Sequence, residues 1–234
     1  MVAIYKREFR SFFQNPLGYV FIGVLLFFEG TQFFTILSSA SSYNFTMMYS
    51  EMFSYCTFLI PLLTMRLLSE DKKQKTDQAL LTAPVSLFGL VFGKFLAALT
   101  VYAIAISFTL VHAFVLAFFA QPQWGIILSN ILGTILYGAA MIAVGLLISS
   151  LTDSQMIAAV GTFGVSLFLL YAYQLATLFN SSFITAIGKG LSFYLRYYQL
   201  TTGLFDFSSI VYFISVIGVF LFLTVNVLEK KRWS

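Results

Sequence analysis

The chain alternates long apolar runs with short polar connections. Six of the runs are about 20 residues or longer, the length that an α-helix needs to cross the hydrocarbon core of a membrane. They occupy residues 17–37, 45–68, 95–119, 126–148, 156–179 and 209–228. Because the runs take more than half of the chain and the rest is split into short segments, the pattern predicts an all-α integral membrane protein, in which residues 1–234 form a single domain of six transmembrane helices.

The segment before the first run, residues 2–14, is amphipathic. At helical spacing it separates aromatic side chains from basic ones, the pattern of a helix that lies in the membrane interface. The residues that define these faces are Tyr5 and Phe9 on one side and Lys6, Arg7 and Arg10 on the other. We expect an N-terminal interfacial helix here; a frayed, positively charged tail is the alternative.

The segment before the last run, residues 180–206, is too long for a simple turn and is rich in apolar and aromatic side chains. Backbone that does not form a spanning helix is tolerated at membrane depth only where protein covers it. We therefore expect one or two short re-entrant helices before the sixth span. A disordered outer loop is the alternative.

The composition supports a membrane protein and argues against a soluble domain or a nucleic-acid-binding protein. Of the 234 residues, 59% are hydrophobic and only 9% are charged, whereas soluble domains carry about 25% charged residues. The 13 Lys and Arg residues give a net charge of +4, but most lie beside the apolar runs rather than on one basic patch. Basic residues in such places orient membrane helices. We therefore expect the lipid bilayer as a partner and no nucleic acid.

The distribution of the basic residues predicts the orientation. Only Lys189 and Arg196 flank the connections on one side of the membrane. The eleven on the other side are Lys6, Arg7, Arg10, Arg66, Lys72, Lys73, Lys75, Lys94, Lys230, Lys231 and Arg232. Since cytoplasmic connections carry the excess of Lys and Arg, we expect both termini to be cytoplasmic and residues 180–206 to lie outside.

The sequence offers little for catalysis or metal binding. An intramembrane enzyme needs a nucleophile with a paired base, or two facing acids. The only histidine, His112, and the only cysteine, Cys56, lie in different apolar runs, and no Gly-x-Ser-x-Gly motif occurs. Scattered acids around one His and one Cys do not form a ligand cluster. We expect no catalytic residue, no metal site and no cofactor bound by this chain.

Gly89, Gly93 and Lys94 together resemble a phosphate-binding loop only superficially. Three residues separate the glycines instead of four, and Phe95 replaces the Ser or Thr that binds Mg²⁺. The chain is therefore not expected to bind ATP in this way. The glycine pair indicates either a close helix contact or a flexible turn before the third span.

Glu29 is the one acid expected deep in the membrane. It is the thirteenth residue after Pro16, which places it roughly 20 Å into a hydrocarbon core about 30 Å thick. A charged side chain at that depth suggests a functional role, here a place on a transport pathway together with Gln32, one turn away. A shallower helix that leaves Glu29 near the outer headgroups is the alternative.

Several stretches of the chain, in order, resemble ABC-2 type transporter permeases. They are residues 66–86 (RLLSEDKKQKTDQALLTAPVS), residues 93–99 (GKFLAAL), residues 149–160 (SSLTDSQMIAAV), and the last span with its flanks (GLFD, VYF and LEKKRW). The resemblance is closest to the compact permeases of the gliding-motility-associated and copper-site-maturation type. Lys75 stands where the family usually has Gly, and Gln78 stands where it often has Glu.

This resemblance implies a half-transporter in a bacterial cytoplasmic membrane. Two six-helix permease subunits, the second being a copy or a paralogue, would associate with a separate cytoplasmic ABC ATPase that binds ATP and Mg²⁺. The pair would move an unidentified substrate by alternating access, with no catalysis by this chain. The alternative is an ATP-driven mechanical or scaffold subunit of a cell-envelope complex that transports no solute.

The resemblance also implies that residues 70–86 form the cytoplasmic segment that couples the permease to the ATPase. A short helix with an exposed apolar face beside charges is suited to docking into a groove on another protein. The candidate coupling residues are Glu70, Asp71, Lys72, Lys73, Thr76, Asp77, Gln78, Leu80 and Leu81. A solvated loop that only obeys the positive-inside rule is the alternative.

Overall fold

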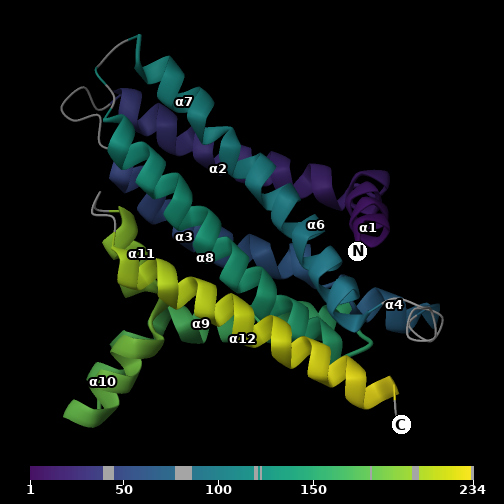
Figure 1. Ribbon diagram of the computed structural model, residues 1–234. Helices are drawn as coiled ribbons and strands as arrows, with labels where there is room; N and C mark the ends of the chain where they lie inside the picture. Colours follow the sequence, from purple (N-terminus) through teal and green to yellow (C-terminus); the bar gives the residue numbers. More distant parts are fainter. Residues whose placement is uncertain are drawn as a thin grey trace.

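The computed structural model describes residues 1–38, 45–76, 86–118, 121, 123–179, 181–201 and 206–232 (Figure 1). Within these ranges every regular element is an α-helix, and six helices are long and apolar enough to cross a membrane. The predicted class, an all-α integral membrane protein, is confirmed.

The bundle contains both long and short helices. The long ones are α2 (Leu17–Ser38), α3 (Phe45–Thr64), α6 (Leu87–Ser107), α8 (Trp124–Leu151), α9 (Gln155–Thr177) and α12 (Phe207–Arg232), and α7 (Thr109–Leu116) continues α6. The short ones are α1 (Val2–Gln14), α4 (Ser69–Lys73), α10 (Ser182–Leu191) and α11 (Phe193–Thr201).

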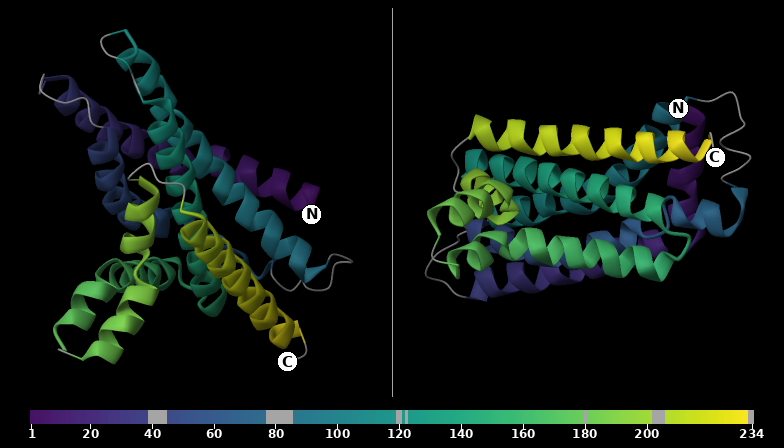
Figure 2. Two further views of the ribbon diagram at one scale, coloured as in Figure 1. Left: turned by 60° about the vertical axis from the view of Figure 1, so that its left-hand side comes forward. Right: turned by 90° about the horizontal axis from the view of Figure 1, so that it is seen from below.

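The long helices lie side by side, and the short helices gather at the two ends of the bundle (Figures 1 and 2). One end of the bundle, which we call the charged end, contains both termini and α4. Helix α1 lies at the same end, across the direction of the long helices (Figure 2). Helices α10 and α11 lie at the opposite end, which we call the far end. Helix α8 contacts α3, α6, α9, α11 and α12, so it is the central helix of the fold.

The helix of the third span begins at Leu87, so the start predicted at residue 95 was wrong. Ser86 has an extended backbone, and its side-chain oxygen accepts a hydrogen bond from the Gly89 amide at 3.2 Å. A serine in this arrangement is a good N-cap. The helix is interrupted at Phe108, and the second half continues as α7. Gly89, Gly93 and Lys94 are therefore helical residues.

The second span also differs from its prediction. Helix α3 ends at Thr64, and a turn over residues 65–68 leads into α4. The Thr64 hydroxyl donates to the carbonyl of Ile60 at 3.1 Å, close to Pro61, which lies inside the helix. The helix stops one turn short of the predicted end at residue 68, although the candidate span as a whole continues through the turn to Lys73.

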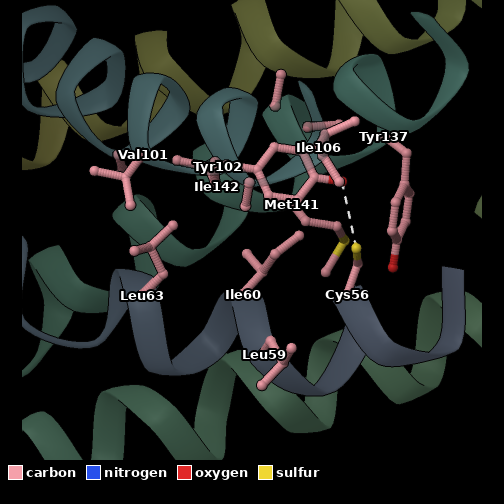
Figure 3. Packing of buried hydrophobic residues seen from close by; sticks show 14 of the residues in the cluster. Cys56, Leu59, Ile60, Leu63, Val101, Tyr102, Ile106, Tyr137, Met141 and Ile142 are labelled. Carbon is pink, nitrogen blue, oxygen red and sulfur yellow. Dashed lines mark hydrogen bonds between the residues drawn. The ribbon is translucent and has the colours of Figure 1, made fainter. Parts of the chain in front are cut away.

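The core lies between α3, α6 and α8 (Figure 3). Ile60 and Leu63 of α3 face Val101 of α6 and Ile142 of α8, and all four are buried. Four buried tyrosines in and beside this core have partners: the hydroxyls of Tyr49, Tyr102, Tyr137 and Tyr197 each make a hydrogen bond. In a membrane, where water cannot satisfy them, such partners are required.

Helix α8 approaches its neighbours closely at two glycines. A Cβ atom on Gly138 would lie 2.1 Å from the Tyr102 ring, and one on Gly145 would lie 2.3 Å from the Thr64 hydroxyl. Small residues at helix contacts allow backbones to pack tightly in membranes. The tight contacts hold α8 against α6 at one glycine and against α3 at the other.

Candidate functional site

Lys94 joins three helices at the charged end. Its ammonium lies 3.0 Å from a carboxylate oxygen of Glu8, on α1, and 2.7 Å from one of Asp71, on α4. The lysine side chain is only 1% exposed, and the two acids are 13% and 16% exposed. Charges in such a place need close partners, because removal from water is costly. We call this arrangement, Lys94 with Glu8 and Asp71, the Lys94 cluster.

Helix α1 lies directly on the start of α6. A Cβ atom on Gly93 would be 3.2 Å from the Ile4 side chain, and one on Gly89 would be 3.8 Å from Met1. The Tyr5 hydroxyl adds a hydrogen bond of 3.2 Å to Thr100. The glycine pair therefore makes a close helix contact, and the flexible turn is excluded.

The remaining side chains of α1 divide into aromatic and basic groups, and a position in the membrane interface stays a prediction. Tyr5 and Phe9 stack with ring centroids 5.9 Å apart, whereas Lys6 and Arg10 are exposed. Arg7 is 2.5 Å from Glu8. Burial lowers the pKa of Arg7, but its hydrogen bond to Glu8 and the charges of Glu8 and Asp71 raise it more, so the pKa lies above its ordinary value. Arg7 thus extends the Lys94 cluster toward the surface.

Helix α4 is also attached to α8 at the charged end. The Ser149 hydroxyl oxygen accepts hydrogen bonds from the amides of Leu68 and Ser69, each at 3.0 Å. Lys72 is buried; its ammonium donates to the Ser150 carbonyl and lies 3.8 Å from Asp153. The segment after the second span is therefore anchored to the connection between α8 and α9.

Arg66, which precedes α4, forms a two-point ion pair with Glu70, in the first turn of α4. The guanidinium donates to the two carboxylate oxygens at 2.6 and 2.9 Å. Both residues, together with Glu8, line a narrow polar crevice between α1 and α4. Paired contacts of this geometry are the strongest that Arg makes with a carboxylate.

The structure divides the predicted coupling residues into three groups. Glu70, Asp71 and Lys72 turn inward and bind other residues of this chain. Lys73 and Thr76 are exposed. Asp77, Gln78, Leu80 and Leu81 lie outside the described residues, and their role in docking stays a prediction.

Lys75 has a left-handed backbone with φ of 56°. It follows α4 and ends the short helix with a turn that favours glycine. This is the position at which the sequence departs from the family's usual Gly. The turn is formed in spite of that departure.

Glu29 lies inside the bundle, on the stripe of α2 residues that also buries Leu25 and Phe33. It is 1% exposed, and neither carboxylate oxygen has a hydrogen-bond partner among the described residues. Gln32 makes no hydrogen bond to Glu29; its amide donates to the Tyr55 hydroxyl at 2.9 Å. The two predicted pathway residues thus lie in different surroundings.

At the far end of the bundle, α8 is hydrogen-bonded to α11. Ser129 donates to the Leu200 carbonyl at 2.8 Å, and the hydroxyls of Thr134 and Tyr197 are 3.0 Å apart. The same helix therefore contacts α4 at one end and α11 at the other.

The start of α12, also at the far end, is capped by Asp206. The carboxylate accepts from the Ser209 hydroxyl at 2.6 Å and from the amides of Ser208 and Ser209. The bond from the Ser209 hydroxyl, those from the amides and the charge of Arg196 together lower the pKa of Asp206. This cap fixes the point at which the chain enters its last span.

Sequence reasoning missed the centre of the site. The sequence alone assigns no role to Glu8, and it indicates for Lys94 no partner and no place in the coupling segment. One signal was present: Ser86 is a good N-cap residue, and a helix that begins there contains Lys94 within an otherwise apolar stretch. Ser149 had no comparable signal.

The comparisons with known proteins agree with the architecture. A family model described as ABC-2 family transporter protein matches residues 2–194. No curated protein matches the sequence. In the part of the chain that the structure describes, no group of three or more His, Cys, Asp or Glu side chains is placed to hold a metal ion.

Proposed function

Because the chain belongs to the ABC-2 family of transporter proteins, we propose that it is the permease subunit that moves an unidentified substrate with ATP hydrolysed by a separate ATPase. The family match and the six spans support a membrane permease. The observation that carries the coupling mechanism is the Lys94 cluster. It joins the segment after the second span to α1 and α6, where a cytoplasmic partner can reach it.

The charged end is the proposed docking face for the ATPase. It carries nearly all the basic residues, which favours a cytoplasmic position, and it includes both termini (Figure 2). Exposed Lys73 and Thr76 lead into residues 77–85, the proposed contact with the partner. The partner ATPase, and not this chain, would bind ATP and Mg²⁺.

The inward contacts of α4 provide a route for the motion. A partner can shift the permease only where the two states differ in contact free energy. Displacement of α4 would strain its bonds to Ser149 and Ser150 and its ion pair with Lys94. Helix α8 continues from these contacts to Ser129 and Thr134 at the far end. We therefore assign α8 the role of transmitting displacement across the membrane.

A complete transporter requires a second permease subunit in this proposal. Six helices enclose too little space for a pathway lined on all sides, so a copy or a paralogue would complete it. Glu29 is costly as an unpartnered carboxyl group in a membrane. We expect it to gain a partner, or contact with water, when the assembled transporter changes state.

Purification of the tagged chain from its native membrane in mild detergent tests the proposal. An ABC ATPase is expected to co-purify, and ATP hydrolysis is expected only with that subunit present. Lys94→Met should reduce ATP hydrolysis by the reconstituted complex in liposomes, whereas Lys230→Met, at an exposed position on α12, should not. Recovery of an active transporter without any ATPase would contradict the proposal.

A mechanical subunit is the second candidate. Helix α10 extends from the bundle at the far end (Figure 1) and exposes Phe183 and Ile187, a surface that an envelope partner could bind. In this case the ATPase would couple to α4 in the same way, but no solute would stimulate hydrolysis. A screen for stimulation in liposomes separates the two candidates.

A further inference from the structure

An apolar groove of about 500 Å³ lies between α2 and α3 near the charged end. Val20 and Val24 line one wall, and Leu59 and Leu62 line the other. Its volume is within the range of small-molecule sites, which is roughly 300–1,000 Å³. The groove is separate from the Lys94 cluster and from Glu29.

The groove opens toward the bilayer. Val20 is 58% exposed and Leu62 is 48% exposed, and both are apolar residues of spanning helices. The groove ends at Asn15 and Arg66, where α2 begins and α3 has just ended. The apolar part of such a groove suits the acyl chain of a phospholipid, and its polar rim at the membrane surface suits the headgroup. In a bilayer, lipid is always present to occupy it.

The polar end favours a negatively charged headgroup. Two of the five N–H groups of Arg66 donate to Glu70, which leaves three for another acceptor. Asn15, at the end of α1, lies at the same rim, and α1 also carries the exposed Lys6 and Arg10. Basic residues beside a span attract the anionic lipids of the cytoplasmic leaflet.

We propose that this groove binds one anionic phospholipid, with an acyl chain between α2 and α3 and the phosphate hydrogen-bonded to Arg66. The proposal rests on the cytoplasmic position of the charged end but not on the identity of the ATPase or substrate. It has a consequence for coupling, because Arg66 also lines the crevice that contains Glu8 and Glu70. A bound lipid would therefore contact the residue that holds the base of α4.

The test uses the purified chain in liposomes with a phosphatidylglycerol that carries a photoactivatable group on its acyl chain. Cross-linked peptides are identified by mass spectrometry. We expect labelling to concentrate on residues 17–24 and 59–65. Val20→Trp and Leu62→Trp, which fill the groove from opposite walls, should each remove most of it. The matched control Phe222→Trp, at an exposed apolar site on α12, should leave it unchanged.

The headgroup is tested by competition with unlabelled phosphatidylglycerol or phosphatidylcholine. Arg66→Gln should weaken competition by phosphatidylglycerol roughly tenfold, the effect of losing a charge-assisted hydrogen bond, and should not change competition by phosphatidylcholine. Lys230→Gln, an exposed basic residue of α12, is the control. Equal labelling of the α12 surface, or equal competition by both lipids in the wild type, would overturn the proposal.

Discussion

Individual residues determine how tightly the helices of this permease are held together. The strongest example is Lys94, which neutralises two acids from other helices while almost fully buried. Removing one partner of such a pair is destabilising by about 3–5 kcal/mol, because the other charge is left without compensation. Tight backbone contacts and one left-handed turn are further points at which a single substitution has a defined effect.

The contact between α8 and α6 depends on the absence of a side chain at Gly138. In Gly138→Ala the new Cβ would overlap the buried Tyr102 ring, so we expect destabilisation of about 1–3 kcal/mol from overpacking. The measurement is the midpoint of thermal unfolding in detergent. Gly164→Ala, with nothing within 4 Å of its Cβ, is the control and should not lower the midpoint. Equal midpoints for both variants would contradict this expectation, because they would show that the Tyr102 ring moves aside without a loss of stability.

Lys75 is the second residue with a defined effect. A left-handed backbone costs a residue with a Cβ roughly 1–2 kcal/mol. Glycine adopts the same conformation without this strain. Lys75→Gly should therefore raise the unfolding midpoint, or slow hydrogen exchange in α4. Lys73→Gly, inside α4, should have the opposite effect, since glycine is unfavourable within a helix. A lower midpoint for Lys75→Gly would show that its lysine makes a contact worth more than the strain.

At the scale of elements, the segment after α4 remains to be tested. Leu80→Asp or Leu81→Asp would place a charge in the proposed apolar contact with the ATPase, which is strongly unfavourable if no partner compensates it. We expect each variant to insert normally and to lose the co-purifying ATPase. Lys230→Glu, at an exposed position on α12, is the charge control and should keep the co-purifying ATPase. Wild-type recovery of the ATPase by both Leu variants would show that the segment is a solvated loop.

Much of the architecture was predictable because a membrane restricts what a chain can do. Runs of about 20 apolar residues have few alternatives to spanning helices, and this locates α2, α8, α9 and α12 closely. The third span was misplaced at its start because Gly89, Gly93 and Lys94 do not look like spanning residues in isolation. Their places are determined by α1, which packs on the glycines and neutralises the lysine.

The candidate site was less predictable because its contacts join residues that are distant in the chain. The sequence alone indicates Asp71 and Lys72 as candidate coupling residues, but it does not indicate the residues that they bind. Glu8, Lys94 and Ser149 come from three other segments. A surface charge and a buried charge look alike in a sequence when the partner is not adjacent, so the inward direction of α4 could be learned only from the structure.

For the whole molecule, the first question is orientation. The basic residues predict that the charged end is cytoplasmic and the far end is outside. Lys189→Cys, exposed on α10, should react with a membrane-impermeant thiol reagent in intact cells, and Lys73→Cys should not. Cys56 is buried and provides an unreactive background. Labelling at position 73 instead of position 189 would reverse the orientation.

The central claim is that motion at the Lys94 cluster passes along the bundle to the far end. It is tested most directly by the labelling rate of Lys189→Cys in the reconstituted complex, with and without ATP and vanadate. The account predicts an ATP-dependent change in this rate that Lys94→Met abolishes while the ATPase stays bound, and that Lys230→Met, at an exposed position on α12, leaves intact. An unchanged response in Lys94→Met would contradict the account.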